Sequence, residues 1–376
     1  MQKKKVLILH APLGAGHETA AKAIAEAFLL RYPNIEIKSA DVLDFSYEIF
    51  KQTLPKAFYF LTFYIPFLYK LFYDYSNHRS RYKFLNHVSS AFLKKSRFVK
   101  FINDFNPDFI ISTNPLPMQL VSKTKEKNII DILSANVCTD FGFHTFWHNA
   151  DVNYYFAANE KIKRALISYG AIPESVKVTG IPISSKFSKL SDRQKTLGEL
   201  GFDVSMPVLL IVGGTTAYGK LMNIIGELKK RNNLIQFIVV AGRDENLQKK
   251  LKKSKINSDP LIRTFGFVNN LDEYMTATDL IFTKAGGLTI AECLTKGLPM
   301  VIYDIIPGQE EDNLNYVVSH GAGIKAENIK KSVEAVVDFF SQPEKLAKMK
   351  ENCRKIAKPN AANDLADFVA SILNSK

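Results

Sequence analysis

The sequence predicts an α/β protein built from two doubly wound domains, each a parallel sheet with helices on both faces. The chain has 376 residues, whereas a single hydrophobic core stops growing at roughly 250–300 residues. Apolar runs of strand length alternate with helical patterns twice over. These runs are nearly continuous in apolar residues, as expected of strands that helices cover on both faces.

Five strands are expected in each half of the chain. In the first half they are Val6–Leu9, Ile35–Ser39, Phe109–Ser112, Ile129–Leu133 and Asn153–Ala157. In the second half they are Val208–Val212, Phe237–Ala241, Ile262–Phe265, Leu280–Thr283 and Met300–Tyr303. We expect the domains to be 1–182 and 183–360, because the residues that follow the boundary are polar and lack a strand pattern. Apolar residues at helical spacing predict a last helix within 361–376.

The composition and charge indicate a folded protein that binds phosphate-bearing ligands. Apolar residues make up 46% and charged residues 23% of the chain, as in ordinary globular proteins. The formal net charge is +13 at pH 7, and a basic surface attracts nucleotides, nucleic acids and anionic lipids. Ten Lys and Arg residues lie between Lys51 and Lys100, against the single acid Asp74.

The sequence predicts no metal site, no disulfide bond and no membrane-spanning helix. No C-x-x-C spacing occurs among the three cysteines, Cys138, Cys293 and Cys353, which fits a reducing cytosol. The first apolar run, Val6–Leu9, is too short for a signal peptide. The longest uncharged apolar stretch, Ala57–Tyr69, has 13 residues, whereas a spanning helix needs about 20.

A glycine turn directly follows the first expected strand. Gly14-Ala15-Gly16-His17 precedes a helical run, with Thr19 as a possible helix cap. Glycines let backbone N–H groups approach a ligand, although the dinucleotide and ATP-binding patterns both fail here. His17 lies at the carboxyl end of a strand, where it could deprotonate a hydroxyl. A tight turn, with the histidine bonded to it, is the structural alternative.

Two further glycine turns occur in the second half. Gly213-Gly214-Thr215-Thr216 and Gly286-Gly287-Leu288-Thr289 each follow a strand and lead into a helix. Backbone donors and helix N-termini of this kind can bind a diphosphate, and Lys284 could add a full charge. An exposed surface lysine beside an ordinary turn is the alternative.

Carboxylate and amide groups follow these turns. Glu292 could accept both hydroxyls of a ribose, or it could be a helix-surface residue. The loop Pro307-Gly308-Gln309-Glu310-Glu311-Asp312-Asn313 matches the hydroxyl pattern of a sugar, or it is an ordinary polar loop.

The segment from Phe45 to Tyr75 holds thirteen aromatic residues and overlaps the start of the basic cluster. Aromatic and aliphatic side chains flanked by Lys and Arg suit an interfacial membrane contact, and buried core is the alternative. Nucleic acid is disfavoured, because the aromatics are mixed with Leu and Ile and are not interleaved with basic residues.

The ordered motifs resemble a known family. They are Gly14-x-Gly16-His17, Thr139-Asp140-Phe141 with His144 and Trp147, Asp151-x-x-Tyr154, Gly180-Ile181-Pro182, Gly213-Gly214, Lys284-Ala285-Gly286-Gly287-x-Thr289 with Glu292, and Pro307-Gly308-Gln309-Glu310. Over residues 5–320 the chain is similar to the diacylglycerol glycosyltransferases, which include bacterial processive diacylglycerol glucosyltransferases and plant monogalactosyldiacylglycerol synthases. Both are similar in turn to the peptidoglycan-precursor N-acetylglucosaminyltransferase.

The resemblance implies a GT-B fold with the active site in the cleft, and inverting transfer from a UDP-sugar without a bound metal or other cofactor. The acceptor-side residues are then Gly14, Gly16, Asp140 and the base His17. The donor-side residues are Phe267 and Val268 for uracil, Gly214, Thr215 and Gly287 for the diphosphate, Glu292 for the ribose, Gln309 and Glu310 for the hexose, with Lys284, Gly286 and Thr289 beside them. It also places the last helix on the first domain. Many relatives have proline where Ala285 stands, which puts the rigidity of the donor loop in question.

The expected activity is transfer of a hexose, glucose before galactose, from a UDP-sugar to the hydroxyl of 1,2-diacylglycerol, giving a β-linked glycolipid. Helix N-termini and Lys284 would stabilise the charge that develops on the departing UDP. The expected partners are UDP-hexose, diacylglycerol and anionic lipids, and not nucleic acid. The expected location is the cytoplasmic face of the cell membrane, as a peripheral protein. A UDP-sugar epimerase and a non-catalytic UDP-sugar sensor are the alternatives, because fold alone excludes neither.

Overall fold

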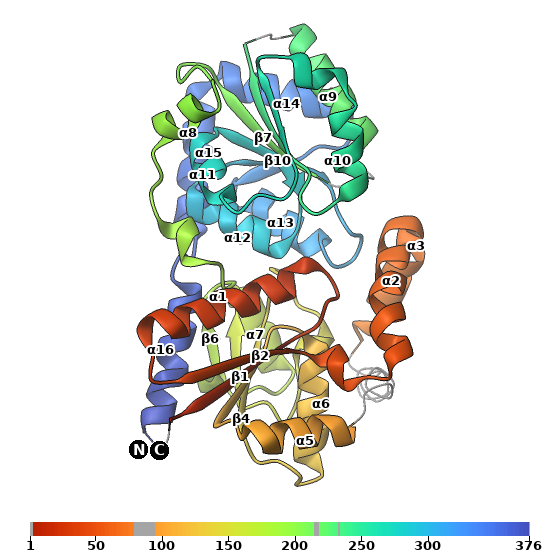
Figure 1. Ribbon diagram of the computed structural model, residues 1–376, viewed down its shortest axis with the longest axis vertical. Coiled ribbons are helices and arrows are strands. Elements are labelled where there is room, and N and C mark those ends of the chain that lie inside the picture. Colours follow the sequence, from red (N-terminus) through yellow and green to blue (C-terminus); the bar gives the residue numbers. More distant parts are fainter. Residues whose placement is uncertain (1–2, 79–94, 214–217, 232–233, 376) are drawn as a thin grey trace. The chain divides into compact units, whose positions relative to one another are not determined.

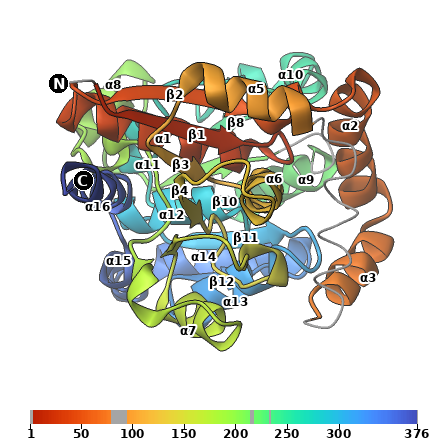
Figure 2. The ribbon, with the colours of Figure 1, turned by 90° about the horizontal axis from the view of Figure 1, so that it is seen from below.

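The computed structural model describes residues 3–78, 95–213, 218–231 and 234–375 (Figures 1 and 2). The chain forms two compact units. Unit 1 comprises Met1–Ser185, Ile306–Asn313 and Lys358–Lys376, and unit 2 comprises Lys186–Ile305 and Leu314–Ala357. The short segment Ile306–Asn313, which the sequence analysis assigned to the second domain, therefore belongs to unit 1.

Unit 1 contains a six-stranded, all-parallel sheet in the order β2-β1-β3-β4-β5-β6. Its strands are β1 (Lys5–His10), β2 (Glu36–Asp41), β3 (Phe109–Ser112), β4 (Leu133–Val137), β5 (Tyr154–Ala157) and β6 (Val176–Val178). Its helices are α1 (Ala15–Arg31), α2 (Glu48–Tyr64), α3 (Pro66–Ser76), α5 (Lys95–Phe105), α6 (Pro115–Glu126), α7 (Glu160–Ser168) and α16 (Ala361–Asn374), with short 3-10 turns that include η2 (Thr145–Trp147).

Helices bury both faces of this sheet. Alternate strand residues such as Ile8 and Ile111 form one core with Phe28 of α1 and with Leu365 of α16, all fully buried. The strand residues between them, such as Leu7, are buried as well. The last helix of the chain thus packs beside the first (Figure 1) and completes the core of unit 1.

Unit 2 contains a second six-stranded, all-parallel sheet, in the order β12-β11-β10-β7-β8-β9. Its strands are β7 (Val208–Val212), β8 (Gln236–Val240), β9 (Ile262–Phe265), β10 (Leu280–Lys284), β11 (Met300–Asp304) and β12 (Gly323–Lys325). Its helices are α8 (Arg193–Glu199), α9 (Tyr218–Arg231), α10 (Glu245–Lys252), α11 (Leu271–Ala277), α12 (Gly287–Lys296), α14 (Ile329–Ser341) and α15 (Pro343–Ile356), and α13 (Glu311–Ser319) begins in the segment that belongs to unit 1.

The predicted fold class, two doubly wound parallel sheets, is confirmed, but three strands differ from the prediction. The strand expected at Ile129–Leu133 is wrong, because β4 begins where that range ends. The sequence of β4 lacks a continuous apolar run, because it contains the buried polar residues Ser134 and Asn136. Ser134 N–H donates to Asn153 Oδ1 at 2.9 Å, and Asn136 Nδ2 donates to the Trp147 carbonyl at 2.9 Å. The strands β6 and β12 were missed because three residues are too few to show a pattern.

The strand order fixes where each unit can bind a ligand. In unit 1, β2 lies on one side of β1 and β3 on the other, so the strand order reverses direction between β1 and β3. In unit 2 the strand order reverses direction between β7 and β10. Open α/β sheets bind ligands beyond the carboxyl ends of the strands at such switch points. The glycine turns after β1 and β10 lie there, as does Gly213 after β7.

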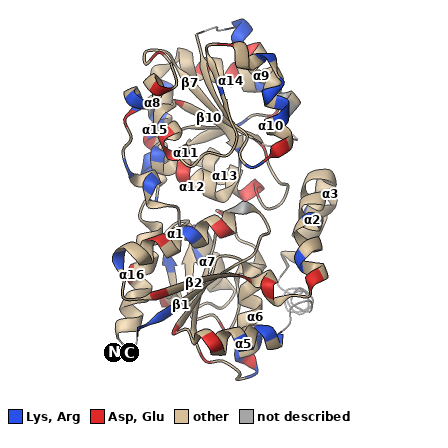
Figure 3. Cartoon of the chain, in the orientation of Figure 1, with Lys and Arg blue, Asp and Glu red and all other residues tan. Residues whose placement is uncertain are grey.

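Helices α2 and α3 stand apart from the layers that cover the sheet of unit 1 (Figures 1 and 2). Their large apolar side chains are exposed, with exposed fractions of 73% for Phe67, 50% for Leu71 and 52% for Phe60. Few charges interrupt them (Figure 3). The buried-core interpretation of the aromatic segment is therefore wrong for these residues.

The basic cluster between Lys51 and Lys100 is only partly described. Within it, Arg79, Arg81, Lys83 and Lys94 lie outside the described residues. Lys51 pairs with Asp44 at 2.7 Å and Lys100 pairs with Asp104 at 2.9 Å, so part of the described charge is neutralised locally.

Candidate active site

Helix α1 carries the first glycine turn in its N-terminal turn. Gly14 is the residue that precedes the helix, with a φ of 96°, a conformation that favours glycine. The helix therefore begins before Thr19, and the expected cap at Thr19 is wrong. Gly16 and His17 lie within the first turn, where backbone N–H groups have no partner inside the helix.

The imidazole of His17 is buried and held in one tautomer. Its Nδ1 lies 2.7 Å from the carbonyl oxygen of Thr113, which follows β3, and 3.0 Å from Thr139 Oγ1, which follows β4. A carbonyl only accepts, so Nδ1 carries the proton and Nε2 keeps its lone pair. Burial lowers the pKa of His17 to about 4, so the ring is neutral near pH 7. This arrangement suits a general base.

Asp140 lies in a network with the loop before α13. Its Oδ1 accepts from Asn313 Nδ2 at 3.0 Å and its Oδ2 accepts from Gln309 Nε2 at 3.3 Å. Asn313 is fully buried, and its Oδ1 accepts from the N–H of Phe141 at 2.6 Å. The structure thus brings two predicted site residues, Asp140 and Gln309, together in unit 1, and Asn313 joins them.

Glu310 is buried at 5% exposure. Its Oε2 accepts from the N–H of Ile306 at 2.8 Å, so the carboxylate shapes its own loop. Any contact of Glu310 with a sugar would have to involve its other oxygen or follow a rearrangement of the loop.

The donor-side turns of unit 2 lie at its switch point. Gly214 and Thr215 are outside the described residues, and Gly213 is described: a Cβ there would meet the Tyr303 hydroxyl at 2.7 Å. Gly286 precedes α12 and Gly287 begins it, so the N–H groups of this turn are free of partners within the helix.

Two other predicted residues flank that turn. Lys284 ends β10, and Thr289 is half-buried in the first turn of α12. Between them, the N–H of Ala285 donates to the carbonyl of Asp304 at 3.3 Å. A proline has no N–H, so this bond fixes the loop by a means that proline could not supply.

Glu292 is a buried carboxyl of unit 2. It lies on α12 at 8% exposure, and burial raises its pKa from 4.5 to about 8. Among the residues that the structure describes, no hydrogen bond to its carboxyl is found. The positive charge of Lys186 opposes this rise in the pKa, but Lys186 itself pairs with Asp272 at 3.4 Å. A buried carboxyl of this kind is suited to accepting ligand hydroxyls.

Phe267 and Val268 follow β9 at the carboxyl edge of the same sheet. Phe267 is 56% exposed, and the guanidinium of Arg243 lies 4.7 Å from its ring centroid. Val268 is half-buried. An exposed ring with a cation above it can stack on a planar base. The sequence analysis missed Arg243, although its position just after β8 could have indicated it.

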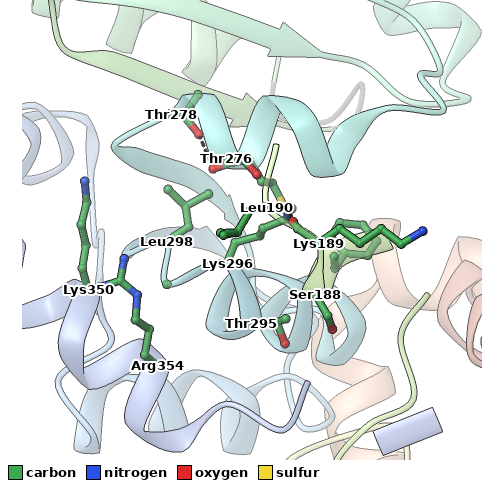
Figure 4. Close-up of a pocket in the computed structure, with 13 residues that line it drawn as sticks. Ser188, Lys189, Leu190, Thr276, Thr278, Thr295, Lys296, Leu298, Lys350 and Arg354 are labelled. Atoms are coloured by element: carbon green, nitrogen blue, oxygen red, sulfur yellow. Dashed lines mark hydrogen bonds between the residues drawn. The ribbon is translucent and has the colours of Figure 1, made fainter. Parts of the chain in front are cut away.

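A cavity of about 260 Å³ in unit 2 contains none of the predicted site residues (Figure 4). Thr278 and Leu298, which line it, precede β10 and β11, so it lies at the amino edge of the sheet, opposite the glycine turns. Two of its lysines have protein partners: Lys350 pairs with Asp279 at 3.3 Å, and Lys296 donates to the Lys189 carbonyl at 2.8 Å.

Two features are absent from the described residues. None of the described helices is both long and apolar enough to span a bilayer. In the described part of the chain, no three His, Cys, Asp or Glu residues form a group that could hold a metal ion. Function without a metal stays a prediction.

His144 gives the stability of unit 1 a pH dependence. Burial lowers its pKa from 6.5 to about 4, so between these values the unfolded chain binds a proton that the folded protein excludes. Its contribution to stability is therefore complete above pH 6.5 and is lost as the pH falls toward 4. At pH 5 the loss is about 2 kcal/mol.

The variant His144→Asn tests this dependence. It keeps an acceptor for the N–H of Phe146, which His144 Nδ1 accepts at 3.1 Å, and it removes the titration. We expect the wild-type advantage in unfolding free energy, measured with urea, to shrink by about 2 kcal/mol between pH 7 and pH 5. An advantage that stays constant would contradict the burial argument.

Comparison with known proteins shows the family to which the chain belongs. Residues 17–183 match the model of monogalactosyldiacylglycerol (MGDG) synthase, and residues 208–367 match the glycosyltransferase family 28 C-terminal domain. The chain is 30% identical to a processive diacylglycerol beta-glucosyltransferase of Bacillus pumilus, over 97% of this chain and 94% of that protein. It is 29% identical to a probable monogalactosyldiacylglycerol synthase 2 of Oryza sativa, over 96% of this chain and 79% of that protein.

A solved structure with a similar fold is the UDP-GlcNAc 2-epimerase of Neisseria meningitidis bound to UDP-GlcNAc. The TM-score is 0.61 at 15% identity, covering 98% of this chain and 100% of that one. At this identity the likeness concerns the fold alone. The sequence matches are specific to glycosyltransferases, and both units have the GT-B type of doubly wound sheet. The chain therefore belongs to the diacylglycerol glycosyltransferase family, and it is an enzyme that transfers a hexose.

Proposed function

We propose that the protein transfers glucose from UDP-glucose to the free hydroxyl of 1,2-diacylglycerol and releases a β-glucosyl glycolipid and UDP. The relative from Bacillus pumilus is named a processive diacylglycerol beta-glucosyltransferase, which supports glucose as the sugar and diacylglycerol as the acceptor. The observation that carries the proposal is the His17 ring, whose Nδ1–H is bonded to the Thr113 carbonyl so that Nε2 is available as a base at the switch point of unit 1.

In the proposed reaction, the diacylglycerol hydroxyl gives its proton to His17 Nε2 while its oxygen attacks C1 of the sugar. The new C1–O bond forms as the bond from C1 to the UDP oxygen breaks, and UDP leaves with the electron pair. Attack from the face opposite UDP inverts C1, so an α-linked donor gives a β-linked product. Fixing the ring in one tautomer avoids reorganisation at the moment of proton transfer.

The predicted donor-side residues would hold the UDP-sugar. The carboxyl of Glu292 would accept the ribose hydroxyls, Phe267 would stack on uracil, and Gln309 and Glu310 would contact the hexose. The N-terminus of α12 and the side chain of Lys284 would stabilise the negative charge that develops on UDP, which is the task that a metal ion performs in other phosphate chemistry. No metal or other cofactor is part of the proposal.

We also propose that α2 and α3 attach the enzyme to the cytoplasmic face of an anionic membrane. We define the docking surface as the exposed side chains Ile49 and Phe60 of α2 and Phe67, Leu68, Leu71 and Phe72 of α3. Insertion of such side chains at the boundary between headgroups and acyl chains would hold the enzyme at the surface where its acceptor resides. Basic residues of the Lys51–Lys100 cluster would add attraction to anionic headgroups.

The docking surface predicts a loss of membrane binding in the double variant Phe67→Ser with Leu71→Ser. Burial of each side chain contributes roughly 1.5–3 kcal/mol, so vesicle binding should weaken by about 10²-fold or more. Sedimentation with vesicles that contain anionic lipid measures it. Leu190→Ser, at a fully exposed leucine of unit 2, is the matched control. Equal binding by the double variant and this control would refute the docking surface.

The decisive experiment for the proposed reaction is a transfer assay. Purified protein is incubated with diacylglycerol vesicles and labelled UDP-glucose or UDP-galactose in parallel, and the lipid products are resolved. Label in lipid from UDP-glucose supports the proposal, and label from UDP-galactose alone would correct the sugar. The fold shared with the epimerase makes that activity the second candidate. It would show as conversion of the UDP-sugar to its epimer with no labelled lipid.

A further inference from the structure

Helix α3 has a second face, which contacts the loop 307–313 that is predicted to bind the hexose. Its exposed face belongs to the docking surface, whereas Tyr69, Lys70 and Tyr73 contact residues 308–311 of the same unit. The hydroxyl of Tyr69 donates to Gln309 Oε1 at 3.1 Å. Lys70 Nζ pairs with Glu311 at 2.8 Å.

Tyr73 packs directly against the backbone of this loop. Gly308 has a φ of 86°, and a Cβ built there would lie 2.8 Å from Tyr73 Cδ1. Both the backbone conformation and the contact thus require glycine at 308. The close approach of the ring fixes how far the loop lies from α3.

The hydrogen bonds of Gln309 determine which way its amide faces. The Asp140 carboxylate only accepts, so Gln309 must turn its NH₂ group toward Asp140 and its oxygen toward Tyr69. Burial and the nearby carboxylates of Asp140 and Glu310 raise the pKa of Tyr69, so its hydroxyl stays protonated and donates. In these two bonds the amide uses one N–H and one lone pair, which leaves one of each for sugar hydroxyls.

The C-terminal end of α3 is anchored to the loop that contains His144 and Thr145. The ring Nε2 of His144 lies 3.2 Å from the Tyr73 carbonyl and 3.1 Å from Ser76 Oγ. Asn77 Oδ1 accepts from the N–H of Thr145 at 2.9 Å. These bonds hold α3 in place beside the segment that carries Asp140, so the hydroxyl of Tyr69 has a fixed position.

We infer that Tyr69 is a positioning residue for the Gln309 amide, and that the helix that meets the membrane thereby sets the geometry with which the enzyme binds the hexose. The inference rests on the proposed function, since it takes Gln309 to contact the sugar. It adds a residue of α3 to the determinants of donor affinity. A residue that acts in this way affects binding of the sugar and leaves binding of the nucleotide unchanged.

The test is Tyr69→Phe, which removes one oxygen atom and keeps the ring. We expect the dissociation constant for UDP-glucose, measured by calorimetry without lipid, to rise roughly fivefold, while that for UDP stays at the wild-type value. The KM for UDP-glucose should rise similarly and kcat should change little. Tyr64→Phe is the matched control, because Tyr64 is an exposed tyrosine of α2, and both of its affinities should equal those of the wild type.

A double-mutant cycle separates this role from a general loss of structure. In a Gln309→Ala background, Tyr69→Phe should have no further effect on UDP-glucose affinity, because Tyr69 acts through Gln309. An unchanged UDP-glucose affinity in Tyr69→Phe, or an equal loss for UDP and UDP-glucose, would overturn the inference alone. Failure of the wild-type protein to transfer a hexose to diacylglycerol would overturn the proposed function, and the inference with it.

Discussion

Replacing His17 with alanine should lower kcat by about 10³-fold and leave UDP affinity unchanged. General-base catalysis contributes roughly 10²–10⁴-fold, and His17 has the geometry for it, with Nδ1 on the Thr113 carbonyl and Nε2 available. The depressed pKa of about 4 keeps the base form complete at neutral pH, so activity should fall on acidification only as the pH approaches that value. Initial rates with diacylglycerol vesicles and calorimetry with UDP measure the two quantities.

His320→Ala is the matched control for the loss of an imidazole. His320 is exposed in unit 2, and its variant should retain the wild-type kcat. A His17→Ala variant with wild-type kcat would show that another group takes the proton, although the transfer reaction itself would stand.

Replacing Glu292 with glutamine should weaken UDP binding by about 10²-fold and stabilise the ligand-free protein at pH 8. A carboxylate that accepts two ribose hydroxyls makes charge-assisted bonds, each worth roughly 1.5–3 kcal/mol. In the ligand-free protein, burial raises the pKa of this carboxyl from 4.5 to about 8. The stability that it contributes is therefore present below pH 4.5 and is lost as the pH rises through 8. Glutamine does not ionise, so at pH 8 the variant should be more stable by roughly 4 kcal/mol.

The two effects of Glu292→Gln are measured by calorimetry with UDP and by urea unfolding at pH 5 and pH 8. The gain in stability should fall to about 1 kcal/mol at pH 5, because the carboxyl is then protonated in the folded protein and the pH lies only just above its unfolded pKa of 4.5. Glu344→Gln, an exposed glutamate of α15, should change neither UDP affinity nor stability. Wild-type affinity in Glu292→Gln would remove Glu292 from the donor site.

The fold could be predicted from the sequence wherever burial is achieved by apolar residues. Strands such as β7 and β8 consist almost entirely of buried aliphatic and aromatic side chains, and their predicted bounds differ from the observed ones by at most one residue. The strand β4 could not be predicted in the same way. Its buried Ser134 and Asn136 bond to residues far along the chain, and those partners are set by tertiary structure and not by local pattern.

In the candidate site, too, residues with a local sequence signal could be predicted, whereas contacts between distant parts of the chain could not. Motif residues such as His17, Gly287 and Glu292 were predictable, because glycine turns and helix starts have local signals. The Thr113 carbonyl that holds the His17 ring has no side-chain signature, and it lies 96 positions away in the chain. Similarly, the sequence placed Asn313 only in a polar loop, and its hydrogen bond to Asp140 is set by tertiary structure.

The place of α16 in unit 1 has a consequence for how the protein is made. Unit 2 has all of its residues once Ala357 has been synthesised, whereas the core of unit 1 lacks Leu365, Val369 and Leu373 until the ribosome has passed those positions. Until then, nascent unit 1 presents the uncovered apolar side chains of Ile8 and Phe28 to chaperones and proteases. A premature stop just after the codon for Ala357 would thus damage unit 1, most of which is encoded earlier, and would spare the residues of unit 2.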